Sequence, residues 1–546
     1  MDPLPPFATH QVDNQPPEFA PRNLWRDDHA LREAVAREGG GDFVDVLAGY
    51  GSLAGDELYR LSFDAHRDRP RLRTHDRFGH RIDLVEFHPN YHRIMQAAIE
   101  HGVAGLSWSQ LRSGAHVARA ALSYLHHQVE PASSCPLTMT HAAIPALRHA
   151  PALAQWAAKA AAAHYDPRDI GIEHKRGVTI GMGMTEKQGG SDVRANMTVA
   201  TPLAGEGEYR LVGHKWFFSA PMSDGFLVLA QAPGGLTCFL LPRWRPDGQR
   251  NALRIMRLKD KLGDWANASS EVEFADAWAY RIGEEGRGVP TILEMVMLTR
   301  LDCMLGSAAE MRMALAQAIH HARHRHTFGK RLVDHPLMRN VLADLAIEAE
   351  AAITLAMRVA RAVDRAPHDP HEAALARIAT AIGKYWVCKR APAFVNEAQE
   401  CLGGAGYVEE SMLPRLYRQA PLNSIWEGSG NIQCLDVLRA LSREREAGAR
   451  LLAELELASG LHHDYDSQLA SLRPVLGGDT RVEESQARRW VEAMALTLQA
   501  GLLLRHGSIV AEGFCRTRLG GDHGNVYGTL PEGVDLTALI DRALPA

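Results

Sequence analysis

The chain has 546 residues, of which 46% are apolar and 23% are charged, and this is an ordinary globular composition. Its length exceeds what one hydrophobic core supports, so several packed domains are predicted. No apolar run approaches the roughly 18 residues of a membrane helix, and a net charge of -5 excludes a general attraction to nucleic acid or anionic membranes.

The N-terminal half of the chain changes its pattern twice. Residues 1–30 are rich in proline and predict an extended arm without a secretory signal, so we expect a cytoplasmic protein. Residues 31–176 have apolar residues three and four apart, as in "IMQAAIEHGVAGLSW", and predict a helical domain. Residues 177–285 alternate β-branched or aromatic residues with polar ones, as in "EYRLVGHKWFFSA", and predict antiparallel strands of a small barrel or sandwich.

Helical spacing returns after residue 285. Residues 286–442 hold long helical segments that fit a four-helix bundle, because no repeat of fixed length recurs. Residues 443–546 predict a further helical domain with a glycine-rich interruption. The predicted fold class is therefore α+β and mostly α. The seven cysteines are scattered and form no CxxC pair, so we expect reduced thiols and no metal site.

The glycine-rich stretch "GMGMTEKQGGSDV" follows the first predicted strand of the β domain. Glycines let a ligand approach the backbone, and the hydroxyl groups of Thr185 and Ser191 can donate hydrogen bonds to it. The stretch is not a GxGxxG motif, because Glu186 stands at the third glycine position. Taken alone, it fits a simple hairpin loop better than a binding loop.

A second motif, "GHKWFFSA", places three aromatic residues beside Ser219. Such residues can form a wall against a flat heterocycle. A core strand is the commoner use of this pattern.

The motif "HHARHRHTFGK" has His320 and His324 on one helical face, but no HExxH pattern completes a zinc site. Arg325 and Phe328 suit a pyrophosphate and an adjoining base. A solvated basic helix end explains the motif equally well.

Two motifs near residue 400 remain. "ECLGGAGYVEE" has three glycines within four residues, which is more than a helix C-cap needs and indicates close approach of another backbone or a ligand. "SIWEGSGN" carries Glu427 beside Ile425 and Trp426. An exposed glutamate is the default, but a carboxylate held against apolar groups has the raised pKa that a general base needs.

In their order and approximate spacing, "MTEKQGGSDV", "GHKWFFS", "RHTFGK", "LGGAGY" and "WEGSGN" resemble the acyl-CoA dehydrogenase flavoproteins over about residues 25–442. The chain is still more similar to the alkylation-response branch of that family, from "NQPPEF" through "SCPLTMT" to "NSIWEGSGNIQCLDVLR". That branch has an extra helical domain in the place of residues 443–546.

The resemblance implies FAD as cofactor and a homotetramer or dimer, with FAD sites at the subunit contacts. The ring and phosphates would meet Met182, Gly183, Met184, Thr185, Gly190 and Ser191. The other side of the ring would meet Trp216, Phe217, Phe218 and Ser219. The adenosine diphosphate part of FAD in a neighbouring subunit would meet Arg325, Phe328, Gly403 and Gly404. Glu400 stands in the place of a family glutamine near the FAD adenosine. The site would be closed by Asn423, Trp426, Ser429 and Asn431.

The resemblance also places Glu427 at the position of the catalytic base and Arg300 close to it. The implied reaction removes the α-proton of an acyl-CoA while the β-hydride goes to flavin N5. Thr299 stands where some members carry their glutamate, which leaves Glu427 as the matching candidate. Lys187 and Gln188 depart from the family pattern near the entrance, and "MVMLTR" is apolar where fatty acyl-CoA dehydrogenases often hold CoA with polar groups.

Two further hypotheses follow. The alkylation-response branch implies a protective protein that binds double-stranded DNA and has little turnover. Residues 441–546 hold 11 arginines and 15 acidic residues, so only local clusters could contact phosphates. These clusters are Arg439, Arg443 and Arg445; Arg488 and Arg489; and Arg516 and Arg518. A nitroalkane-type flavin oxidase is less favoured, because it normally has an aspartate at the base position.

Overall fold

The computed structural model describes residues 9–545. Its N-terminal part is largely helical, and helix α1 begins where the extended arm ends, with the Asp28 carboxylate accepting a hydrogen bond from the Leu31 amide at its N-terminus. The helices are α1 (His29–Arg37), α2 (Val44–Leu53), α3 (Tyr59–Arg67), α4 (Pro89–Glu100), α5 (Leu106–Ser109), α6 (Ala115–His127), α7 (Ser134–Leu147) and α8 (Ala154–Ala160).

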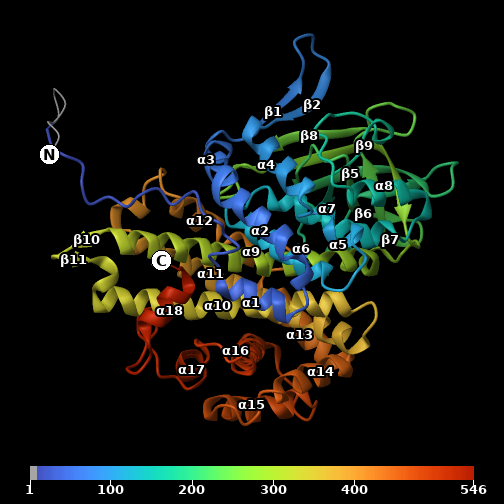
Figure 1. Ribbon diagram of the computed structural model, residues 1–546. Coiled ribbons are helices and arrows are strands. Elements are labelled where there is room, and N and C mark those ends of the chain that lie inside the picture. Colours follow the sequence, from blue (N-terminus) through green and yellow to red (C-terminus); the bar gives the residue numbers. More distant parts are fainter. Residues whose placement is uncertain (1–8, 546) are drawn as a thin grey trace.

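A β-hairpin interrupts this helical part, and the sequence did not predict it. Strands β1 (Arg71–His75) and β2 (Arg81–Glu86) pair antiparallel and project from the top of the molecule in Figure 1. In β1 the residues facing solvent are arginines and a histidine, and the residues between them are only half-buried. The contrast between its two faces is therefore too weak to indicate a strand.

The middle of the chain forms one seven-stranded sheet. Strand β6 pairs with β7 as well as with β3 and β4, which closes the sheet into a barrel. The pairing is mostly antiparallel, as predicted, but β3 and β4 run parallel to β6. The strands are β3 (Ile180–Gly183), β4 (Val199–Pro202), β5 (Glu208–Ser219), β6 (Gly225–Ala232), β7 (Gly235–Pro242), β8 (Leu253–Leu258) and β9 (Ser269–Ile282).

Four helices form the bundle: α9 (Gly288–His324), α10 (Pro336–Arg365), α11 (Pro370–Glu400) and α13 (Gly430–Arg443). Helix α9 is buried along most of its length, because it packs against α6 and α7 on one side and α10 and α11 on the other. A small hairpin, β10 (His326–Thr327) with β11 (Lys330–Arg331), follows α9, and α12 (Leu413–Gln419) precedes the loop to α13. Within residues 9–545, no helix has the length and apolar character needed to cross a membrane.

Four of the last helices lie below the bundle in Figure 1: α14 (Arg445–Glu456), α15 (His463–Leu476), α16 (Ala487–Arg505) and α17 (Ala511–Phe514). The last one, α18 (Leu536–Ala543), lies beside α10. Buried ion pairs fasten this part to α10. The Asp344 carboxylate, fully buried, accepts hydrogen bonds from Arg518 (2.5 Å), His523 (3.1 Å) and the Gly528 amide (2.9 Å).

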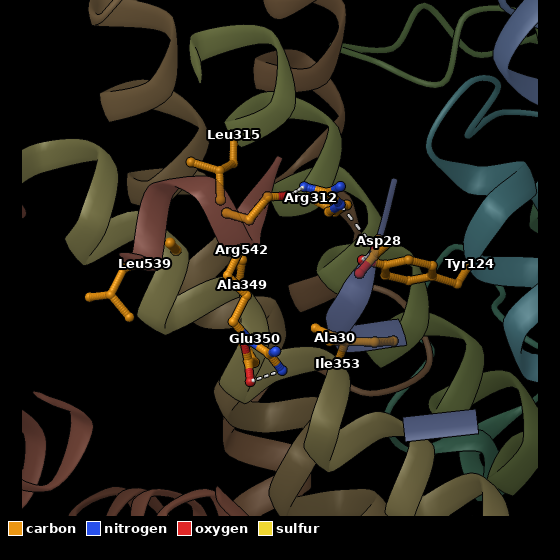
Figure 2. Close-up of a pocket in the computed structure, with 12 residues that line it drawn as sticks. Asp28, Ala30, Tyr124, Arg312, Leu315, Ala349, Glu350, Ile353, Leu539 and Arg542 are labelled. Carbon is orange, nitrogen blue, oxygen red and sulfur yellow. Dashed lines mark hydrogen bonds and ion pairs between the residues drawn. The ribbon is translucent and has the colours of Figure 1, made fainter. Parts of the chain in front are cut away.

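The C-terminal helix also contacts α10 and α1. Arg542 of α18 pairs with Glu350 (2.7 Å) and Glu33 (2.6 Å), while Arg312 of α9 pairs with Asp28 (2.9 Å). Figure 2 shows Arg542, Glu350, Arg312 and Asp28 around a cavity of about 20 Å³. That volume suits about one water molecule, so the cavity is a packing gap and not a ligand site.

Candidate active site

The loop before α13 turns sharply at Glu427. Glu427 has φ 57° and Gly428 has φ 92°, so two consecutive residues lie in the left-handed region. Glycine adopts this conformation freely, but for Glu427 it costs roughly 1 kcal/mol or more. The surrounding structure must therefore hold the loop in this course.

Three buried side chains from different helices hold it by donating to its carbonyl oxygens. Lys384 of α11 donates to the carbonyls of Trp426 (2.8 Å) and Gly428 (2.5 Å). Gln433 of α13 donates to the carbonyls of Glu427 (3.0 Å) and Gly428 (2.9 Å), and Arg300 of α9 donates to that of Glu427 (3.1 Å). The backbone on both sides of Glu427 is thus fixed.

The Glu427 carboxylate is directed toward α9. Its Oε2 accepts a hydrogen bond from the Thr299 hydroxyl at 2.7 Å. Burial raises the pKa of Glu427 above the ordinary glutamate value, while the Thr299 hydrogen bond and the charges of Lys384 and Arg300 oppose the rise. Its Oε1 accepts no hydrogen bond from any of residues 9–545, and a partly buried carboxylate with a raised pKa and one such oxygen can act as a general base.

Arg300 contributes through its position more than through its charge. Its guanidinium pairs with Asp436 of α13 at 2.6 Å, and Arg377 pairs with the same carboxylate at 2.9 Å. Asp436 therefore offsets the positive charge of Arg300 and orients it toward the Glu427 carbonyl.

The two motifs of the β domain lie side by side. The Trp216 amide donates to the Thr185 carbonyl at 2.9 Å, which joins the end of β5 to the loop after β3. A Cβ atom on Gly183 would lie 2.5 Å from the Phe218 ring, so only glycine allows these strands to pack here. A Cβ atom on Gly190 would lie 2.3 Å from the Thr185 hydroxyl, so glycine is also needed for the loop to fold back.

A buried ion pair supports this loop from beneath. Lys215 and Glu186 are both fully buried and lie 2.7 Å apart. Glu186 also accepts hydrogen bonds from the Thr198 hydroxyl and the Met197 amide. Burial opposes the ionisation of Glu186, but Lys215 and these hydrogen bonds outweigh it and lower its pKa to about 2.

The base loop and the β-domain motifs meet at one hydrophobic cluster. Met182, Met184 and Trp426 are all partly buried against it, and Leu298, next to Thr299, belongs to it. The base loop, the N-terminal half of α9 and the edge of β3 are thus brought together, although they are more than 100 residues apart in the sequence.

These residues fit the ring of a flavin. Met182, Met184 and Trp426 offer apolar surfaces, while Thr185 and Ser219, both partly exposed, offer hydroxyl groups for the polar edge. Trp216 is half-buried and Phe217 is 52% exposed, so both are accessible. Ser191 and Ser429 are exposed as well.

Two of the predicted cofactor residues have interior side chains. Phe218 is fully buried in the barrel core, where it packs against Phe226. Asn423 is buried beneath the base loop: its oxygen accepts a hydrogen bond from the Trp426 indole at 2.9 Å, and its amide donates to Glu310 at 3.4 Å. Their side chains therefore support the site from behind.

Another predicted group lies at the far end of the bundle. Arg325 lies directly after the last residue of α9, and 26 residues separate it from Thr299. At a helical rise of about 1.5 Å per residue, the two residues are about 39 Å apart along the helix axis. Phe328 is 98% exposed, and Glu400, Gly403 and Gly404 are exposed at the end of α11. Figure 1 shows β10 and β11 at the end of the bundle far from the barrel. One chain therefore does not bring these residues to its own Glu427.

Arg325 already has a partner within the chain. Its guanidinium donates to the Asn14 carbonyl of the N-terminal arm at 2.7 Å, and the Asn14 side chain bonds the backbone of His326. The N-terminal arm thus fixes the position of Arg325, the residue predicted to contact a pyrophosphate.

The C-terminal helices reach the candidate site through Arg488. Arg488 of α16 donates to the Asn431 side chain at 2.9 Å, in the first turn of α13. Asn431, one of the predicted cofactor residues, is therefore positioned by a side chain of the C-terminal helices, which lie outside the bundle.

Sequence reasoning missed the supports of the site. Lys384, Gln433 and the pair Glu186 with Lys215 were not predicted to contribute. For Lys384 a signal was present, because a lysine within the apolar stretch "IATAIGKYWVC" has to be either exposed or satisfied by hydrogen bonds.

Three family models match the chain in succession. The adaptive response protein AidB N-terminal domain matches residues 14–167, the acyl-CoA dehydrogenase middle domain matches residues 181–277, and the acyl-CoA dehydrogenase C-terminal domain matches residues 286–442.

Among proteins of known name, the chain is 53% identical to the acyl-CoA dehydrogenase-type protein AidB of Escherichia coli (strain K12), over 80% of this chain and 81% of that protein. It is 29% identical to acyl-CoA dehydrogenase family member 11 of Caenorhabditis elegans, over 85% of this chain and 80% of that protein.

Solved structures agree with this relationship. The C. elegans protein ACDH-11 in complex with C11-CoA superimposes with a TM-score of 0.86 at 26% identity, and 94% of each chain is covered. Butyryl-CoA dehydrogenase of Megasphaera elsdenii superimposes with a TM-score of 0.56 at 20% identity over 78% of this chain and 100% of that chain, and this likeness concerns the fold alone.

Proposed function

The chain belongs to the acyl-CoA dehydrogenase family, in the branch of the adaptive response protein AidB, and we propose that it is an FAD-containing flavoprotein in which Glu427 acts as a base toward an acyl-CoA. The observation that carries this proposal is the Glu427 carboxylate, which is hydrogen-bonded to Thr299 and adjoins the apolar cluster of Met182, Met184 and Trp426. The similarity to a protein solved with C11-CoA supports an acyl-CoA as the class of substrate.

Proton removal is the task of this chain's own residues. The α-proton of a thioester is far less acidic than an ordinary glutamic acid, so the base needs a raised pKa and the substrate needs stabilisation of the negative charge that develops on its carbonyl. Burial supplies the first, and Thr299 and the fixed loop keep the carboxylate in one orientation. FAD, when bound, supplies the acceptor for the β-hydride.

The position of the distant residues supports an assembly of several copies. Arg325 and Phe328 are too far from Glu427 to serve the same site, and Phe328 is almost completely exposed. We propose that they contact the adenosine diphosphate part of FAD in a neighbouring copy, within a homotetramer. We also keep the prediction of a cytoplasmic location.

Anaerobic bleaching of the flavin by a panel of acyl-CoAs tests the enzymatic proposal. We expect the purified protein to be yellow, to release FAD on denaturation and to lose its flavin absorbance with at least one acyl-CoA of suitable length or branching. Apolar residues stand in "MVMLTR" where fatty acyl-CoA dehydrogenases often hold CoA with polar groups, so we expect the CoA part to bind weakly. A colourless protein that cannot be reconstituted with FAD would refute the cofactor, and a yellow protein that no acyl-CoA bleaches would refute the substrate class.

The placement of the arginine clusters favours a second candidate function, binding of double-stranded DNA in the response to alkylation. Arg443, Arg445 and Arg489 are exposed, and they lie on or beside α13 and α16, which pack against each other. Arg518, in contrast, is engaged by Asp344 and Glu348 and is not available to phosphates. The DNA-binding surface would therefore lie at the junction of α13, α14 and α16.

A salt titration of duplex binding tests this candidate. We expect the affinity to fall steeply with salt, and Arg443→Glu with Arg445→Glu to weaken binding and to reduce the slope by about one per lost phosphate contact. Arg473→Gln is the matched control, because Arg473 lies in the same part of the chain but pairs with Glu456. Absence of retardation at low salt would refute DNA binding.

A further inference from the structure

Lys384 is a buried lysine whose ammonium group contacts backbone carbonyls. It lies in the middle of α11 and is 1% exposed. Its two hydrogen bonds reach the carbonyls of Trp426 and Gly428, which are the residues on either side of Glu427. A buried lysine is costly, so its retention at this place calls for a reason beyond packing.

Lys384 and Arg300 differ in whether a paired carboxylate offsets their positive charge. Arg300 is paired with the Asp436 carboxylate at 2.6 Å, which offsets its positive charge. Within residues 9–545 Lys384 forms no carboxylate ion pair, and its hydrogen bonds go to neutral carbonyls. Glu427 is the acidic residue between the two carbonyls that Lys384 bonds. The positive charge of the lysine therefore acts on the Glu427 carboxylate without being offset by a paired carboxylate of its own.

The geometry of the loop gives Lys384 a second task. Glu427 and Gly428 are both left-handed, and the two carbonyls that Lys384 joins lie before and after this turn. A single ammonium group that bonds both carbonyls keeps the ends of the turn at a fixed separation. Gln433 bonds two carbonyls of the same loop but carries no charge, so it can share only the holding task.

We propose that Lys384 is a positioning residue for the base: it holds the left-handed turn at Glu427 and Gly428 and keeps a buried positive charge beside the Glu427 carboxylate. This inference rests on the proposed function only in taking Glu427 as the base. The lysine thereby limits how far burial disfavours the ionised carboxylate, which is the form of Glu427 that can accept a proton.

Groups other than Lys384 also influence the titration of Glu427. Helix α9 contributes Arg300, Thr299 and the buried thiol of Cys303. Helix α13 contributes Asp436, which acts indirectly because it pairs with Arg300. Burial raises the pKa of Glu427, and Lys384 and Thr299 oppose the rise. Removal of the Lys384 charge therefore moves the protonation of Glu427 to higher pH.

Infrared difference spectroscopy between the protein and its Glu427→Gln variant isolates the protonated carboxyl band of Glu427 and needs neither flavin nor acyl-CoA. We expect Lys384→Met to move the midpoint of this band to higher pH. Gln433→Leu, which loosens the same loop without changing its charge, is expected to leave the midpoint in place. Lys384→Arg is expected to restore it, and Lys389→Met, an exposed lysine on the same helix, serves as the matched control.

An unchanged midpoint in folded Lys384→Met would refute the proposal that the Lys384 charge acts on Glu427. An equal shift of the midpoint in Gln433→Leu would refute it too, because the shift would then come from loop geometry alone. If Lys384→Met does not fold, Lys384→Gln, which keeps a neutral donor, decides between the same outcomes. With an acyl-CoA that bleaches the flavin, we expect Lys384→Met to lower the rate of reduction on the order of 100-fold and to move the acid limb of kcat/KM to higher pH. The infrared result stands even if no acyl-CoA is a substrate.

Discussion

Replacement of Glu427 by glutamine is expected to lower the rate of flavin reduction by a reactive acyl-CoA by about 10²–10⁴-fold or more, with FAD binding and thermal stability close to those of the parent protein. Glutamine has nearly the same shape and can still accept the Thr299 hydrogen bond, but it cannot take a proton at neutral pH. The measurement is stopped-flow bleaching of the flavin under anaerobic conditions.

The matched control is Glu446→Gln, which neutralises an exposed glutamate on α14 that pairs with Arg450. It is expected to leave the rate unchanged. Equal rates in Glu427→Gln and the parent protein would remove Glu427 as the base. A second variant, Thr299→Val, tells whether the loss concerns the proton or the orientation of the carboxylate, because it keeps Glu427 and removes only its hydrogen bond.

Replacement of Lys215 by methionine is expected to destabilise the β domain by about 3–5 kcal/mol. It leaves Glu186 as an uncompensated charge among fully buried groups, since the two side chains lie 2.7 Å apart and both have no exposed surface. Unfolding in urea, followed by far-ultraviolet circular dichroism, measures the effect. Lys187→Met, an exposed neighbour of the same loop, is expected to change stability little.

The pH dependence identifies the ion pair as the cause. The folded-state pKa of Glu186 is lowered from 4.5 to about 2, so the stability that the pair contributes is present above pH 4.5 and is lost as pH falls toward 2. The difference between Lys215→Met and the parent protein should therefore shrink over this range. The double variant Glu186→Leu with Lys215→Met, which removes both charges, should recover part of the loss. A constant difference at all pH values would assign the effect to packing.

Local patterns were enough for much of the fold. The order of helical, strand and helical segments follows from hydrophobic spacing, which depends only on near neighbours in the chain. The hairpin β1 with β2 was not predicted, because the residues of β1 that alternate with its exposed arginines and histidine are only half-buried. The parallel pairing of β3 with β6 also escaped, because alternation indicates a strand but not its partner.

The motif "GHKWFFSA" in strand β5 contains both buried and accessible aromatic residues, and the sequence pattern did not distinguish them. The pairing of β5 with β9 shifts register between Lys215 and Phe218, so both of these residues point into the interior although they are three positions apart. Trp216 and Phe217, between them, are left accessible. A bulge breaks the two-residue alternation, and for this reason the sequence could not tell the core aromatic residue from the accessible ones.

The motifs, the family resemblance that they carry and the choice of Glu427 as the candidate base could all be inferred from the order of the residues. The groups that surround this base could not, because they come from distant parts of the chain. Lys384 is 43 residues before Glu427 and Thr299 is 128 residues before it, and they meet it because α9, α11 and α13 pack around one loop. The protonation of a buried carboxylate depends on the charges and donors within a few ångströms, and those neighbours are chosen by packing between distant segments, which no local pattern contains.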